Sequence, residues 1–204
     1  MDQNAIEIGR LLRSGIAGFV AGARVSENDI PRFGALVRAP LGADLNIYGL
    51  IYDMHVDDDG LVRQLVTADS VDAEVIEDNR INRNVPMEMS VLAVGYRDGG
   101  QIYHLLPPRP PLSLDVVHMC GSDELVEFTG AGRFGYFRHI LRATDAPIGE
   151  ILAAHIQAAA QAHEDAGNAE WRDAATQELI ALLRDDYPTL MSVLSALGDS
   201  IINL

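Results

Sequence analysis

The chain has no lysine, although it is 204 residues long; all 15 of its strongly basic residues are arginines. This absence excludes a P-loop, because the pattern G-x-x-x-x-G-K-[ST] needs a lysine that reaches the terminal phosphates. The nearest glycine-rich stretch, residues 130–135, fits the spacing G-x-G-x-x-G. That pattern binds dinucleotides only where it follows a strand, and Leu125 to Phe128 read as a helical turn. We therefore interpret 130–135 as a loop between two elements.

Cysteine and long hydrophobic runs are also scarce. The single cysteine, Cys120, excludes an internal disulfide, and its place beside Met119 in a short apolar segment indicates a small core residue. No apolar run approaches the roughly 20 residues that span a bilayer, and residues 1–12 lack the apolar region of a signal peptide. With 48% hydrophobic residues the chain has enough apolar side chains for a real core. We expect a folded cytoplasmic protein.

Positive charge is in short supply, since the net charge is −15. Binding along nucleic acid depends on neutralising phosphates with Lys and Arg, so direct nucleic-acid binding is disfavoured. Residues 1–143 hold 13 arginines against 20 acidic residues, a net charge of −7, whereas residues 144–204 hold 2 against 10, a net charge of −8. This change places a domain boundary at 143–147, where Thr144 or Asp145 can cap a helix and Pro147 suits its first turn.

The segment 82–111 predicts a β-hairpin that ends in a proline-locked exit. An apolar run at 91–94 is followed by the turn signal Asp98-Gly99-Gly100, and residues 101–106 resume as a second strand. Prolines at 107, 108, 110 and 111 fix φ and lack an N–H, so the second strand cannot continue. The chain must leave the sheet in an extended conformation.

The same residues carry a family resemblance. The segments VLAVGYRDG (91–99), PPRPPL (107–112) and SDELVEFTG (122–130) resemble the end of a HAS-barrel, the small β-barrel of HerA-type DNA-translocating ATPases and of the catalytic subunits of rotary ATP synthases. The likeness covers roughly 15–130 and rests on the order of its segments. The earlier ones are Gly18–Phe19–Val20, Phe33–Gly34–Ala35–Leu36–Val37 and Tyr48–Gly49–Leu50–Ile51–Tyr52.

The resemblance implies an α+β fold in which residues 1–143 form a HAS-like β-barrel. In HerA-like proteins a P-loop ATPase domain follows, and this chain departs from that pattern. What the resemblance implies instead is a protein partner, a separately encoded HerA-like ATPase or a DNA end-processing nuclease. An edge strand of an incompletely closed barrel would supply the docking surface.

Beyond residue 144 the apolar pattern changes to a period of 3.6, which predicts an acidic region of two to three helices over 144–204. Apolar faces recur in three segments, which end at Gly167, at Asp185–Asp186 and near Leu197. The tail Ile201, Ile202 and Leu204 is apolar to the end, and it either docks into its own core or offers a partner surface. About 60 residues are too few to bury this surface alone, so we expect the region to pack on the barrel or on another chain.

Between two barrel strands we expect a helical insertion at about 57–86. It contains Arg80 and Arg83, one helical turn apart, which could clamp a carboxylate or a phosphate, or form an internal network with Asp78. A third arginine, Arg109, is held between prolines, so it would lose little entropy on engaging a partner. We interpret Arg80, Arg83 and Arg109 as candidate partner-binding residues.

Motifs for catalysis are absent from the sequence. The six histidines form no H-E-x-x-H or H-x-E pair, and there is no G-x-S-x-G elbow. We expect no metal or cofactor, and a non-catalytic assembly or adaptor protein that can also form a homo-oligomer. The alternative is a small-ligand or nucleic-acid binding module of the small-barrel type, with Tyr48, Tyr52, Tyr96 and Tyr103 as stacking surfaces.

Overall fold

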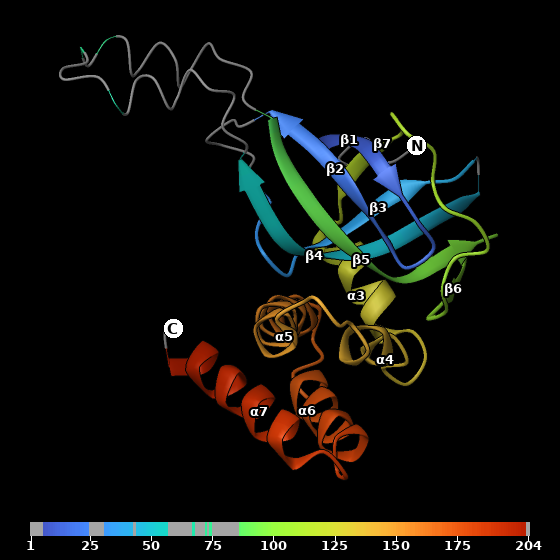
Figure 1. Ribbon diagram of the computed structural model, residues 1–204. Coiled ribbons are helices and arrows are strands. Elements are labelled where there is room, and N and C mark those ends of the chain that lie inside the picture. Colours follow the sequence, from blue (N-terminus) through green and yellow to red (C-terminus); the bar gives the residue numbers. More distant parts are fainter. Residues whose placement is uncertain are drawn as a thin grey trace.

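A computed structural model describes residues 6–24, 31–42, 44–56, 67, 72, 74 and 86–202 (Figure 1). The insertion predicted at 57–86, apart from residues 67, 72, 74 and 86, lies outside these described residues, and so do Arg80 and Arg83. The interpretation of the tail as a partner surface also falls outside them, because the side chains beyond residue 199 are not described.

Six antiparallel strands form a closed barrel. They are β1 (Glu7–Ser14), β2 (Gly18–Arg24), β3 (Leu36–Pro40), β4 (Leu45–Val56), β5 (Pro86–Asp98) and β7 (Val116–Met119). The order β2-β1-β7-β3-β4-β5 becomes a ring because β2 also pairs with β5. Strand β6 (Gln101–Tyr103) forms the predicted hairpin with β5 through the turn at Gly99 and Gly100.

The expectation of an incompletely closed barrel is wrong. Strand β2 pairs with β5 along its whole length, from Gly18 opposite Leu92 to Arg24 opposite Pro86. The strands approach closely at Gly18, where a Cβ would lie 2.3 Å from the carbonyl oxygen of Val91, so only glycine fits. Among the described strands, β6 alone pairs with a single neighbour and therefore keeps an edge.

Successive side chains along the strands alternate between two hydrophobic cores, one on each side of the barrel wall. In β3 and β4, Val37, Ala39, Ile47 and Ile51 point into the barrel interior. Their neighbours Leu36, Tyr48 and Leu50 belong to a second core between the barrel and the helices. A period of two places successive side chains on opposite faces, so strands that are apolar on both faces need a cover on the outside.

The helical layer that follows the barrel provides that cover, and its five described helices confirm an all-helical C-terminal region. They are α3 (Ser122–Gly130), α4 (Phe137–Leu141), α5 (Ile148–Asp165), α6 (Trp171–Leu182) and α7 (Tyr187–Ile202). The three helices expected after residue 144 correspond to α5, α6 and α7. The last barrel strand ends at Met119, so α3 and α4 already belong to the helical layer.

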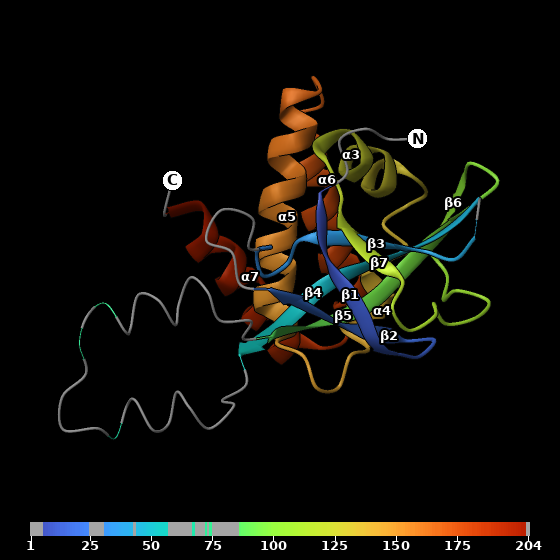
Figure 2. The same cartoon turned by 90° about the horizontal axis from the view of Figure 1, so that it is seen from above.

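The barrel and the helices form two layers (Figure 1). Helices α3, α4 and α5 lie next to the barrel, and α6 and α7 pack on α5 from the far side. Figure 2, viewed from the barrel side, places the helices behind the strands. The connection from β6 to β7 runs along the barrel, away from the α6–α7 turn. This arrangement positions the surface described next.

Candidate interaction surface

The segment between β6 and β7, residues 104–115, exposes an unusual number of leucines. We call it the connector. Leu105, Leu106, Leu112 and Leu114 are all exposed, and Leu112 and Leu114 have exposed fractions of 67% and 70%. Pro107 and Pro111 are buried, so they anchor the segment to the body of the protein. We define the connector surface as these four leucines.

Both ends of the connector are fixed by hydrogen bonds. At its start, His104 Nε2 donates to the carbonyl oxygen of Phe128 in α3 at 3.0 Å. The carbonyl oxygen of His104 accepts hydrogen bonds from Arg138 Nη2 and from His139 Nε2, both in α4. Since a carbonyl oxygen only accepts, Nε2 carries the proton in both histidines.

The far end of the connector is tied to β1 and to the turn after β3. Ser14 Oγ donates to the carbonyl oxygen of Pro111 at 2.6 Å, and Arg10 Nη1 donates to that of Leu114 at 3.2 Å. Arg109 Nη2 donates to the carbonyl oxygen of Leu41 at 3.2 Å. The connector therefore presents its leucines from a braced backbone, which lowers the entropy lost on binding.

Leu114 combines exposure with backbone strain. Its φ is +73°, in the left-handed region that favours glycine and asparagine, and its side chain is 70% exposed. The turn is closed by hydrogen bonds from the amide of Leu114 to the carbonyl oxygen of Leu11, 2.8 Å, and from the amide of Leu112 to Asp115 Oδ2, 3.1 Å. A strained, exposed leucine at such a position points to function.

Of the three arginines predicted to bind a partner, Arg109 alone lies among the described residues. Its hydrogen bond to the carbonyl oxygen of Leu41 braces the connector, and the residue remains exposed. The sequence analysis did not identify the four leucines of the connector surface as site residues. The available signal was a group of leucines beside prolines, in a segment with neither a period of two nor a period of 3.6.

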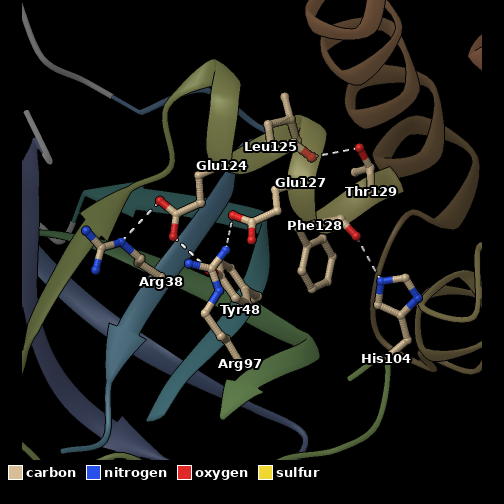
Figure 3. A network of polar contacts seen from close by, with 9 residues as sticks. All are labelled: Arg38, Tyr48, Arg97, His104, Glu124, Leu125, Glu127, Phe128 and Thr129. Atoms are coloured by element: carbon tan, nitrogen blue, oxygen red, sulfur yellow. Dashed lines mark hydrogen bonds and ion pairs between the residues drawn. The ribbon is translucent and has the colours of Figure 1, made fainter. Parts of the chain in front are cut away.

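A polar network lies beneath α3 (Figure 3). Tyr48 Oη donates to Glu124 Oε1 at 2.7 Å, and Arg38 Nε forms an ion pair with Glu124 Oε2 at 3.2 Å. Arg97 forms an ion pair with Glu127 and lies over the Tyr48 ring, 5.9 Å from its centroid. Two arginines balance two carboxylates, so the network holds α3 on the barrel at no net charge.

Tyr48 and Cys120, which lie in this layer, are held in their neutral forms. Burial, and then the hydrogen bond to Glu124, raise the pKa of Tyr48 well above its usual value. Burial also raises the pKa of Cys120 far above that of an ordinary thiol. A half-buried, protonated thiol is a poor nucleophile, and Cys120 packs against the core formed by the barrel and the helices.

Three of the four tyrosines proposed as stacking surfaces are either buried or stacked on another tyrosine. Tyr48 is fully buried, so the expectation that it lies on a surface is wrong. Tyr96 and Tyr103 stack on each other, with ring centroids 5.0 Å apart and planes 21° apart. Tyr52 lines a hollow of about 620 Å³ between the barrel and the α4–α5 link, which Arg13, His139 and Arg142 also border.

In the part of the chain that the structure describes, no three side chains of His, Cys, Asp or Glu gather in a way that could hold a metal ion. None of the described helices is long and apolar enough to cross a membrane. No family model matches the chain, and no curated protein matches it.

Proposed function

We propose that this protein is a non-catalytic assembly or adaptor protein that docks on a separately encoded partner through the connector surface. The observation that carries the proposal is the braced connector with four exposed leucines, one of them in a strained conformation. A group of exposed apolar side chains often marks an interaction site, and a braced backbone reduces the entropy that is lost on binding.

The resemblance to HAS-barrels gives the class of partner. A small six-stranded barrel followed by helices fits such a domain in outline. The 204 residues of this chain contain no lysine and therefore no P-loop, so the proposal assigns any ATP-driven step to the partner. We therefore propose a HerA-like ATPase or a DNA-processing nuclease as the partner.

The free edge of β6 is a second element of the docking mode. Strand β6 continues into the connector, so a partner strand that pairs with its edge would lie beside the leucines. Main-chain hydrogen bonds at an edge give affinity, and side-chain anchors give specificity. Arg80, Arg83 and Arg109 remain proposed partner-binding residues, and Arg109 lies within the connector.

The test is affinity capture of the tagged protein from its native host after gentle cross-linking. We expect the wild type to retain a P-loop ATPase or a nuclease, and Leu112→Glu to lose it. Asn168→Glu is the matched control, because it adds the same charge at an exposed residue between α5 and α6, away from β6 and the connector. Equal recovery with wild type and Leu112→Glu, or recovery of neither class of partner, would contradict the proposal.

A second candidate function is the binding of a small anion, favoured by the hollow that Arg13 and Arg142 border. Arg13 Nη1 lies 3.4 Å from Glu88 Oε2, so its charge is partly neutralised already. Calorimetric titration with inorganic phosphate tests this candidate. Binding that disappears in Arg142→Ala supports it, and no heat above dilution for the wild type ends it.

A further inference from the structure

Two histidines hold the start of the connector to the helical layer. His104 Nε2 donates to the carbonyl oxygen of Phe128, near the end of α3, at 3.0 Å (Figure 3). The carbonyl oxygen of His104 in turn accepts hydrogen bonds from Arg138 Nη2 and from His139 Nε2 in α4, the second at 3.2 Å. We call these three hydrogen bonds the latch. Because β6 ends one residue earlier, the latch fixes the point where the connector leaves the barrel.

The ring of His104 is half-buried between aromatic side chains and a glycine-rich loop. Its centroid lies 4.9 Å from that of the Phe128 ring and 5.0 Å from that of the Tyr136 ring. The loop passes the Nδ1 edge so closely that a Cβ on Gly132 or Gly135 would lie 3.4 or 3.5 Å from Nδ1. Among the described residues, the ring forms one hydrogen bond, from Nε2 to Phe128. A second proton, on Nδ1, would find no acceptor among them.

The charges that act on the two rings of the latch are positive. The ring of His104 feels the charge of Arg138 and of a protonated His139, and the ring of His139 feels the charges of Arg138 and Arg142. Burial lowers the pKa of both histidines, and the positive charge of Arg138 lowers it further. Both rings are therefore held neutral, and each proton gained adds a positive charge beside an arginine.

The carboxylates on the elements around the latch do not offset this charge. On α3, Glu124 is paired with Arg38, and Glu127 with Arg97. In the hollow that His139 borders, Asp145 accepts a hydrogen bond from Thr144, and Arg13 is paired with Glu88. The first-turn residue Asp123 lies at the opposite end of α3 from Phe128, and the loop before α4 adds a further arginine, Arg133. No described carboxylate acts on the pKa of either histidine.

We propose that His104 and His139 form a pH-sensitive latch, which holds the start of the connector while both rings are neutral and releases it when they gain protons. The far end stays tied to β1 by the hydroxyl of Ser14, which does not titrate in this range. In the released state the rings are solvated and titrate near pH 6.5, the ordinary value for histidine. The released state therefore binds protons that the closed state does not, so the closed state loses stability as the pH falls below about 6.5.

Limited proteolysis with thermolysin, which cuts beside leucine, tests release at Leu105 and Leu106. The cleavage rate there, identified by mass spectrometry, is divided by the rate for a peptide of residues 99–110 at the same pH, which corrects for the protease. The double variant His104→Gln and His139→Gln keeps an N–H donor at each position but does not titrate. His118→Gln is the matched control, because it removes another half-buried histidine, in β7 and outside the latch. Circular dichroism checks the fold at both pH values.

Between pH 7.5 and 5.5 the ratio of released to closed protein should rise up to about tenfold for each histidine, and up to about 100-fold for both. We therefore expect the corrected rate of the wild type and of His118→Gln to rise by about 10- to 100-fold, and that of the double variant by less than about twofold. A wild-type rise below about threefold, or an equal rise in the double variant, would overturn the inference.

The single variants decide the matter if the double variant does not fold. Each of His104→Gln and His139→Gln loses one titrating ring, so each should show a smaller rise than the wild type. A rise equal to that of the wild type in both would overturn the inference. The proposed docking function is unaffected by that failure, because release is measured without a partner.

Discussion

Replacing Leu114 with asparagine should weaken binding of the partner without lowering the free energy of unfolding. The left-handed conformation costs a leucine about 1–2 kcal/mol, and asparagine adopts it at lower cost. The lost burial is small, because the side chain is 70% exposed and full burial of a leucine contributes about 1.5–3 kcal/mol. We therefore expect Leu114→Asn to leave the free energy of unfolding unchanged or to raise it by up to about 1 kcal/mol.

Urea denaturation followed by tryptophan fluorescence measures this change. The single tryptophan, Trp171, is buried and stacks on His163 with ring centroids 4.7 Å apart, so its emission reports the packing of the helical layer. The matched control is Leu11→Ala in the neighbouring strand, where the leucine is fully buried. That change should cost about 2–5 kcal/mol.

Partner capture is the second half of the same experiment. Leu114→Asn should reduce recovery of the partner, although the protein is as stable as the wild type. A loss of about 2 kcal/mol or more in the free energy of unfolding would show that Leu114 supports the fold and would refute the strain argument. Undiminished capture would refute its role in docking.

Three further predictions concern the fold that presents the surface. Burial lowers the pKa of His155 to about 4, so between pH 6.5 and 4 the unfolded state binds a proton that the folded state does not. The free energy of unfolding should therefore fall by about 3 kcal/mol over this range. In His155→Gln the urea midpoint should fall less between the same two pH values. Gly34→Ala should cost about 2–4 kcal/mol by thermal denaturation, since φ is +79° and the new Cβ would lie 2.7 Å from that of Ala154; a wild-type midpoint would contradict this. Tyr48→Phe should cost about 1.5–3 kcal/mol in urea, because Glu124 loses a buried donor, and no loss would show that the network does not hold α3.

The hairpin and the C-terminal helices were predictable because their signals are local. Ile151, Leu152 and Ile156 recur at helical spacing and are buried where α5 meets the barrel and its neighbouring helices. Two glycines after Asp98 permit the turn between β5 and β6. The second strand was predicted to reach Leu106, but β6 already ends at Tyr103, before the first proline. In each case the residues that decide the structure are adjacent or one helical turn apart.

Other features depend on contacts between distant segments. Tyr48 reads as a surface aromatic from the sequence, but α3, more than 70 residues later, covers it with Glu124 and Phe128. Closure of the barrel depends on β2 meeting β5, and no local pattern encodes that pairing. The connector leucines look like core residues by type, but in the structure they are exposed, whereas the neighbouring Pro107 and Pro111 are buried.

Site-specific photo-cross-linking in the native host tests docking through the connector most directly. A photoreactive residue replaces Leu112 on the connector surface or, as a control, Glu164, an exposed residue near the end of α5. We predict a cross-link from position 112, and none from position 164, to a P-loop ATPase or a nuclease. Cross-links of equal yield from both positions, or none from position 112, would contradict the account.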